Sequence, residues 1–331
     1  MESIYYVTTW LCHRTCPHCY DDRFHPYHGE ALSAVVSESR DSFARIIANL
    51  PESMVYLDCE GVHRTGRVIL AGGEVLLEPI RESVLYPAIR LLRQKYEAQG
   101  GIKVVVQTTG DLLTARIVRE LKECGVWLVS VSGMDDYHEG LDDLDRRAAL
   151  MAKDTQLFEA EGFLREAAAD GPGPYYHFFG ATPEAWIGRL WPRGRAWTNS
   201  LSSATLEDNF CNRWSGGLGF LEAGRAGAEV SIDPGGDVYP CCLKTRVPVG
   251  NVLETPLTEI LARLRGNPIY EAINAGTPQR MGLTHGWSEE HFLAQSRTSL
   301  PNGQSYQNLC VGCDRFHEAV LGGAGLVQLV P

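Results

Sequence analysis

The chain has 331 residues, of which 44% are hydrophobic and 21% are charged. This is ordinary globular composition, and the length suits one large domain with a smaller one. The formal net charge of −11 argues against a nucleic-acid partner, because a phosphate backbone requires a basic surface. No apolar run approaches the ~18 residues of a membrane helix, so we expect neither a membrane partner nor a signal peptide.

Short apolar runs typical of strands alternate with longer helical patterns over residues 1 to about 155. Strands are expected at Ile4–Thr9, Arg67–Leu70, Lys103–Gln107 and Trp127–Val131. Helices are expected at Ser39–Leu50, Ile80–Tyr96, Thr114–Cys124 and Asp154–Ala169. This alternation predicts an α/β fold of parallel strands and crossover helices, whose sites gather at the carboxyl ends of the strands.

Glycine and turns become more frequent from about residue 205. Glu229–Ile232 and Asp237–Tyr239 flank Pro234-Gly235-Gly236, which predicts a β-hairpin. A short helix is expected at Leu257–Arg265, and the polar stretch Thr298–Asn308 is expected to be a loop. The sequence therefore predicts two domains, a core over residues 1–200 and a small C-terminal domain over residues 205–331.

The chain contains ten cysteines, and three of them follow the first predicted strand as Cys12-x-x-x-Cys16-x-x-Cys19. Without an export signal they indicate a reducing cytoplasm, where clustered cysteines bind metal or take part in redox chemistry. Three thiolates on a four-iron cube leave one iron free to bind a small molecule. Zinc also accepts cysteines at this spacing, and His13 and His18 are close in sequence, so a zinc site is the alternative.

Together with the segments that follow, this triplet resembles the start of a radical S-adenosylmethionine (SAM) enzyme. Gly72-Gly73-Glu74 resembles the family's Gly-Gly-Glu element, which contacts the amino group of SAM. Gln107–Gly110 and Val129–Gly133 are similar to the two strand-end elements that follow, although Ser132 stands where many relatives have aspartate. The resemblance implies a partial (β/α)6 TIM-like barrel, with SAM contacts at His18, Gly72, Gly73, Glu74, Gln107, Thr109, Ser130, Ser132 and Arg147.

Four later cysteines resemble the ligands of the twitch domain, the short form of the SPASM extension. Cys241 follows Gly236 by five residues, Cys211 lies upstream, and Cys310-x-x-Cys313 lies downstream. The twitch domain is a small α+β unit, a β-hairpin with a short helix, that binds an auxiliary [4Fe–4S] cluster, and four ligands complete one such cluster. The resemblance thus implies SAM and two [4Fe–4S] clusters as cofactors, while a four-cysteine zinc ribbon is the alternative.

Two further stretches are candidates for the wall of the substrate site. Asp135 and His138 follow the fourth predicted strand and could include a general base. Arg193 and Arg195 could hold hydroxyl groups or a carboxylate of a substrate. A solvated surface loop is the alternative for both stretches. Cys242 adjoins a ligand, and neighbours in an extended chain point to opposite sides.

The resemblance implies that a flavodoxin- or ferredoxin-type reductant supplies an electron and that a 5′-deoxyadenosyl radical removes a hydrogen atom from a small-molecule substrate. A fully ligated auxiliary cluster cannot bind substrate, so we expect it to accept an electron. The sequence is therefore interpreted as a dehydrogenase that oxidises a secondary alcohol of an aminoglycoside- or aminocyclitol-type substrate to a ketone, as in antibiotic biosynthesis.

Two alternatives remain at this point. One is an epimerase of an aminoglycoside or peptide that uses a cysteine as hydrogen donor. No cysteine lies between Cys124 and Cys211, which disfavours epimerisation unless Cys242 or Cys59 points into the site. The other alternative, from a different class, is a non-catalytic metal-binding or electron-carrier protein.

Overall fold

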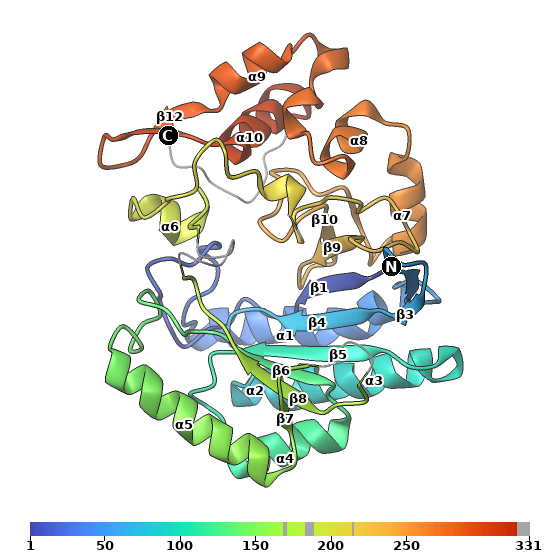
Figure 1. Ribbon diagram of the computed structural model, residues 1–331, viewed down its shortest axis with the longest axis vertical. Helices are drawn as coiled ribbons and strands as arrows, with labels where there is room; N and C mark the ends of the chain where they lie inside the picture. Colours follow the sequence, from blue (N-terminus) through green and yellow to red (C-terminus); the bar gives the residue numbers. More distant parts are fainter. Residues whose placement is uncertain (168–170, 183–188, 214, 323–331) are drawn as a thin grey trace.

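The computed structural model describes residues 1–167, 171–182, 189–213 and 215–322 (Figure 1). Its main sheet has the strand order β11-β10-β9-β1-β4-β5-β6-β8-β7. The strands of the core part are β1 (Ser3–Val7), β4 (Arg67–Ala71), β5 (Lys103–Thr108), β6 (Leu128–Val131), β7 (Leu164–Arg165) and β8 (Tyr175–Phe178). Each pairs in parallel with its neighbour, which confirms the expected α/β class and mostly parallel sheet.

Helices connect these strands as crossovers. They are α1 (Gly29–Ala48), α2 (Glu78–Ile80), a π-helical segment (Arg81–Leu85), α3 (Tyr86–Tyr96), α4 (Ala115–Cys124) and α5 (Leu144–Ala160). α1 packs on α3, α3 on α4, and α4 on α5. Alternate strand residues such as Val68 and Leu70 pack in the core cluster that includes these helices, whereas Ile69 and Val105 belong to a separate apolar cluster. The two faces of the sheet therefore have different partners.

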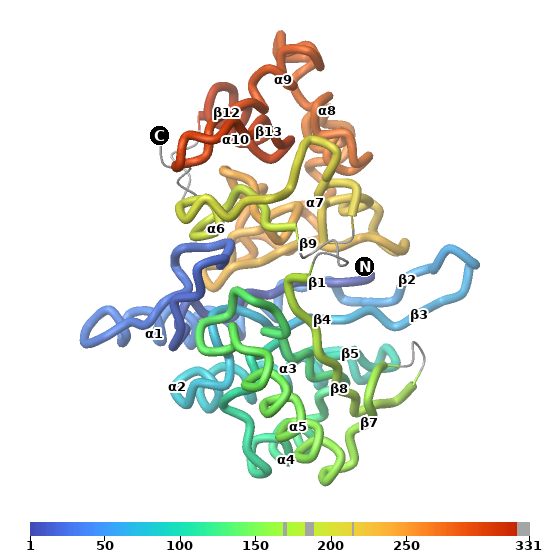
Figure 2. Tube along the Cα trace, turned by 60° about the vertical axis from the view of Figure 1, so that its left-hand side comes forward, coloured from blue at the N-terminus to red at the C-terminus, as the bar shows by residue number. Residues whose placement is uncertain are grey.

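The C-terminal hairpin is continuous with the core sheet. β9 (Glu229–Ile232) pairs in parallel with β1, and β10 (Asp237–Tyr239) and β11 (Gly250–Asn251) follow in antiparallel register. The remaining helices are α6 (Gly194–Thr198), α7 (Leu257–Leu264), α8 (Pro268–Asn274), α9 (Glu289–Gln295) and α10 (Leu309–Val320). In Figures 1 and 2, α8 to α10 lie at the top and α4 and α5 at the bottom, with the sheet between them. The predicted hairpin and short helix are therefore present.

Three expectations about single elements were wrong. The helix expected at Ser39–Leu50 is α1, which begins at Gly29 and ends at Ala48. The helix expected at Asp154–Ala169 begins at Leu144 and ends at Ala160, and residues 168–170 lie outside the described part. Asp143 caps it by accepting a hydrogen bond from the backbone N–H of Arg146, a start signal that the sequence contains.

The third error concerns the stretch expected to be a loop. Residues 298–308 contain most of a two-stranded hairpin, β12 (Arg297–Ser299) with β13 (Ser305–Gln307). Its turn includes Asn302-Gly303, with a positive φ of 86° at Gly303, so the Asn-Gly pair could have indicated it. A further hairpin, β2 (Val55–Leu57) with β3 (His63–Thr65), lies between α1 and β4.

Candidate active site and metal centres

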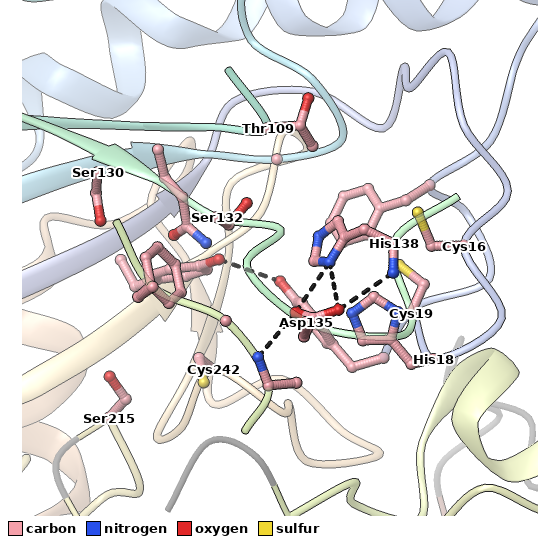
Figure 3. Close-up of a pocket in the computed structure, with 18 of the residues that line it drawn as sticks. Cys16, His18, Cys19, Thr109, Ser130, Ser132, Asp135, His138, Ser215 and Cys242 are labelled. Carbon is pink, nitrogen blue, oxygen red and sulfur yellow. Dashed lines mark hydrogen bonds and ion pairs between the residues drawn. The ribbon is translucent and has the colours of Figure 1, made fainter. Parts of the chain in front are cut away.

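A cavity of about 450 Å³ opens between the sheet and the segments after β8 (Figure 3). Side chains from the strands, including Tyr5, Ile69, Val105 and Leu128, give part of its wall an apolar surface. Polar groups from the strand ends complete that side; they are Gln107, Thr109, Ser130 and Ser132. The cavity therefore lies where parallel strands usually place a site.

The three N-terminal cysteines, Cys12, Cys16 and Cys19, all line this cavity. Burial raises the pKa of Cys12 to about 12 and that of Cys19 to about 11. Thiols this shielded from water stay neutral on their own but become thiolates when a metal binds them. The backbone N–H of Cys19 donates to the carbonyl of Cys16 at 3.2 Å, which closes the loop. The donor set fits an iron–sulfur cluster with three protein ligands.

Gly72 and Gly73 let the chain at the end of β4 approach the cysteine loop closely. A Cβ at Gly73 would lie 2.1 Å from the carbonyl oxygen of Leu11 and 2.9 Å from the Cβ of Cys12. A Cβ at Gly72, where φ is +154°, would lie 2.6 Å from the carbonyl oxygen of Thr9. Only glycine fits at these contacts. Both glycines line the cavity beside the cysteines.

Glu74, which the resemblance implies contacts SAM, is not among the residues that line the cavity. Its side chain is fully buried and accepts four hydrogen bonds. The donors are the backbone N–H of Leu76, the hydroxyl of Thr108, and both the N–H and the hydroxyl of Thr109, at 2.7 to 2.9 Å. Glu74 therefore ties the glycine pair to the end of β5, and Thr109 in turn lines the cavity.

Ser130 contacts His177, a residue that no sequence pattern indicated. The Oγ of Ser130 lies 2.5 Å from Nε2 of His177, and both residues line the cavity. Their positions are opposite each other in the β6–β8 register. Burial lowers the pKa of His177, so its imidazole is neutral at pH 7. A neutral imidazole in a cavity wall can accept a proton from a bound molecule.

His18, Asp135 and His138 form a polar cluster on the side of the cavity near Cys16 and Cys19 (Figure 3). Their ligand atoms lie within 4.8 Å of one another. Asp135 accepts hydrogen bonds from the Nδ1 of His138 at 2.9 Å and from three backbone N–H groups.

Electrostatics set the protonation states of Asp135 and His18 in this cluster. Although burial alone would raise it, the pKa of Asp135 is held well below its usual value by His138. Burial and the neighbouring His138 lower the pKa of His18 to about 4. At neutral pH the cluster therefore contains a carboxylate and at least one neutral imidazole. Arg147, another expected SAM contact, is ion-paired with Asp136 at 2.7 Å instead of lining the cavity.

The four later cysteines are brought together around a second, small cavity. Its wall includes Cys211, Cys241, Cys310 and Cys313. Cys310 and Cys313 lie in the first two turns of α10, which Asn308 caps by accepting a hydrogen bond from the N–H of Cys310 at 2.9 Å. Burial raises the pKa of all four thiols, to about 12 at Cys241 and about 11 at Cys310. Four shielded thiols fit one fully ligated metal cluster.

Arg193 and Arg195 face different sites. Arg195 lines the large cavity and donates from Nε to the carbonyl of Cys16 and from Nη2 to that of Phe24, each at 2.8 Å. Arg193 lines the four-cysteine cavity instead, where it is ion-paired with Asp314 at 2.7 Å. The structure thus places Arg195 against the N-terminal cysteine loop and Arg193 beside the other four cysteines.

One layer of side chains separates the two cavities. Phe210 and Leu243 line both of them. Cys242 lines the large cavity, whereas its neighbour Cys241 lines the small one. Burial raises the pKa of Cys242 well above its usual value, so its side chain is a neutral thiol. In Figure 3, Cys242 lies apart from Cys16 and Cys19, on the side of Ser215.

Residues 225–314 match the SPASM family, described as an iron-sulfur cluster-binding domain. Three of the four later cysteines, Cys241, Cys310 and Cys313, lie in the matched range. No curated protein matches the chain in sequence. Among the helices that the structure describes, none has both the length and the hydropathy needed to cross a bilayer.

Several solved structures are similar in overall shape. BtrN in complex with AdoMet and 2-DOIA has a TM-score of 0.42 and 15% identity, over 87% of this chain and 90% of that one. Native anSMEcpe with bound AdoMet has a TM-score of 0.45 and 13% identity, over 84% of each chain. Streptococcus suis SuiB bound to the precursor peptide SuiA has a TM-score of 0.43 and 11% identity, over 87% and 74%. Likeness at this level carries no conclusion about chemistry.

Proposed function

We propose that this chain is a radical SAM enzyme with an auxiliary iron–sulfur cluster. Cys12, Cys16 and Cys19 would hold the first [4Fe–4S] cluster, and SAM would bind beside them against Gly72-Gly73 and Ser130. When bound, the first cluster and SAM supply hydrogen-atom abstraction from a substrate carbon, and the auxiliary cluster supplies an electron acceptor. The shared cavity of the three thiols and the strand-end groups supports this assignment.

The reaction we propose is oxidation of a secondary alcohol to a ketone. Once the carbon-bound hydrogen atom is removed, the substrate must lose one proton and one electron. His177 is placed to take the proton, because its neutral imidazole lines the cavity and is oriented by Ser130. The observation that carries the proposal is that Phe210 and Leu243 line both cavities, which leaves a short path for the electron to the four-cysteine site.

The charges of the wall narrow the substrate class. Among the described residues that line the cavity, Asp135 is the one carboxylate, and it already accepts hydrogen bonds from His138 and from backbone N–H groups. Arg14 and Arg195 stand in the same wall. A polyamine sugar would find no free counter-charge among these residues, so we propose an alcohol with few amino groups in place of a polycationic aminoglycoside.

Epimerisation is the second candidate, and Cys242 favours it. The absence of cysteines between Cys124 and Cys211 disfavours an epimerase only if no other thiol enters the site, but Cys242 lines the cavity. Its raised pKa keeps it in the S–H form, which is the form that donates a hydrogen atom. In that reaction the thiol would return a hydrogen atom to the opposite face of the substrate carbon, and one electron from the auxiliary cluster with one proton from solvent would restore the resulting thiyl radical to the thiol. Cys59 is exposed and does not line the cavity.

One experiment tests the proposal and separates the candidates. The anaerobically reconstituted protein would be incubated with SAM, a reductant and a panel of cyclitols and secondary alcohols, and product masses recorded in H₂O and D₂O. Oxidation removes two hydrogens, whereas epimerisation leaves the mass unchanged in H₂O and adds one deuterium in D₂O. Cys242→Ala should preserve oxidation and abolish epimerisation, with Cys59→Ala as the control. No 5′-deoxyadenosine from SAM under any condition would contradict both candidates.

A further inference from the structure

Arg193 is a fully buried charge whose role the proposed reaction leaves open. It is 2% exposed and forms an ion pair with Asp314, which is also 2% exposed in its side chain. Its Nη1 lies 2.7 Å from one carboxylate oxygen, and its Nη2 donates to the other at 3.0 Å. The desolvation energy lost on burying such a pair can exceed the Coulombic energy that the pair gains. Stability alone is therefore a weak reason for its presence.

The guanidinium is the member of the pair that faces the four cysteines. Arg193 lines the small cavity together with Cys211, Cys241, Cys310 and Cys313, whereas Asp314 is not part of that wall. Two backbone carbonyls hold the guanidinium in place: Nε donates to Leu243 at 3.2 Å and Nη1 to Pro192 at 2.9 Å. The positive end of the Arg193–Asp314 dipole is therefore directed toward the thiol group.

A cluster in this site would be an anion. Four thiolates outweigh the positive charge of a [4Fe–4S] cube, and one-electron reduction makes the cluster more negative still. A fixed cation in a dry wall stabilises the more negative state more strongly than the less negative one. Lys244 also lines the small cavity, but its ammonium is bound to Asp21 at 2.7 Å.

We propose that the Arg193–Asp314 pair sets the reduction potential of the auxiliary cluster, with Arg193 raising it so that the cluster can accept an electron from the substrate. This inference rests on the proposed [4Fe–4S] cluster at the four cysteines and deepens its role as acceptor. Arg193 affects the reaction only through the charge that it places beside the cluster, and it does not contact the substrate.

The test is an EPR-monitored redox titration of the anaerobic holoprotein, with the N-terminal cluster as internal reference. Arg193→Met should move the auxiliary midpoint to a more negative potential. A unit charge a few ångströms away at an effective dielectric of ~20 changes an equilibrium by roughly tenfold or more, which is about 59 mV for one electron. Arg193→Lys should keep most of the wild-type potential.

Asp314→Asn removes the negative end of the dipole and should shift the auxiliary midpoint in the positive direction. The double variant Arg193→Met/Asp314→Asn should lie between the two single variants. Arg315→Met is the matched control: it removes a cation from the same helix, but Arg315 donates to the carbonyls of Gln295 and Arg297, each at 2.8 Å. The control should leave the auxiliary midpoint unchanged.

The outcomes separate this inference from the proposed function. If the wild-type protein contains iron but shows no second cluster, the proposed function fails, and the inference fails with it. If the second cluster is present and Arg193→Met has the same midpoint as Arg315→Met, the inference alone is refuted. If Arg193→Met does not retain its cluster, Asp314→Asn decides, and an unchanged or more negative midpoint in that variant refutes the inference.

Discussion

Replacing Lys244 by methionine should destabilise the protein, because it removes a buried charge that joins the two cysteine-bearing regions. Lys244 is 1% exposed, and its Nζ lies 2.7 Å from the carboxylate of Asp21. Asp21 follows Cys19 by two residues, and Lys244 follows Cys241 by three. The ion pair therefore links the loop of the three N-terminal cysteines to the loop that carries Cys241.

The expected loss can be worked out from these contacts. Removing one partner of a buried ion pair costs about 3–5 kcal/mol, because the other charge stays buried and unpaired. Here Arg23 still binds Asp21 through two hydrogen bonds, at 2.7 and 2.9 Å, which lowers the cost. Lys244 also lies 4.2 Å from the ring centroid of Trp10, a cation–π contact that methionine loses. Together we expect a loss of about 3 kcal/mol in the free energy of unfolding.

Urea unfolding of the anaerobic protein, followed by circular dichroism, measures this loss. Arg263→Met is the control, because the pair of Arg263 with Glu259 is exposed and an exposed pair contributes about 0.5 kcal/mol or less. A Lys244→Met variant as stable as the control would refute the reasoning.

The Lys244–Asp21 pair also makes stability sensitive to acid. Although burial alone would raise the pKa of Asp21, Lys244 and Arg23 hold it well below its usual value. Its contribution is therefore present above the unfolded-state pKa of about 3.9 and lost as the pH falls through the folded-state value.

Three further substitutions test other parts of the structure. Burial raises the pKa of Asp154 to about 7, so the folded state binds a proton more tightly than the unfolded state, and stability falls as the pH rises toward 7. Asp154→Asn should make stability less dependent on pH and raise Tm at pH 8. Thermal melts from pH 5 to 8 with an unchanged pH dependence would count against this. Glu74→Gln replaces a hydrogen-bond acceptor by a donor opposite the N–H of Thr109. It should lower the free energy of unfolding in urea by about 1–3 kcal/mol. An unchanged free energy would mean that the Glu74 carboxylate does not accept all of these hydrogen bonds. Arg195→Met frees the carbonyls of Cys16 and Phe24, and should speed loss of about half of the iron to a chelator while the other half stays; equal loss from both centres would contradict the assigned contacts.

Local patterns explain what could be predicted from the sequence. Strands such as Arg67–Ala71 are short apolar runs followed by glycine, and their alternation with helices is sufficient to predict the parallel sheet. The cysteine spacings are likewise local, and the fold then brings Cys211 beside Cys241, Cys310 and Cys313. Such features can be predicted because they depend on residues close in sequence or on the repeated alternation of strands and helices.

Contacts between distant segments could not be predicted in the same way. His177 meets Ser130 only because β8 pairs with β6, and β8 itself was not expected. Arg193 and Arg195 are two residues apart, yet they face different cavities. Between them Gly194, with a φ of +47°, passes so close to the N-terminal loop that a Cβ there would lie 2.6 Å from the carbonyl oxygen of Cys19. Such a close approach has no signature within the segment itself.

The most direct test of the account is to measure iron and SAM cleavage together in oxygen-free preparations. We expect about eight irons per chain in the wild-type protein, and formation of 5′-deoxyadenosine when SAM and a reductant are added. The variant with Cys12, Cys16 and Cys19 replaced by alanine should keep about four irons and form no 5′-deoxyadenosine. Zinc in place of iron at the N-terminal cysteines, or undiminished SAM cleavage in that variant, would contradict the account.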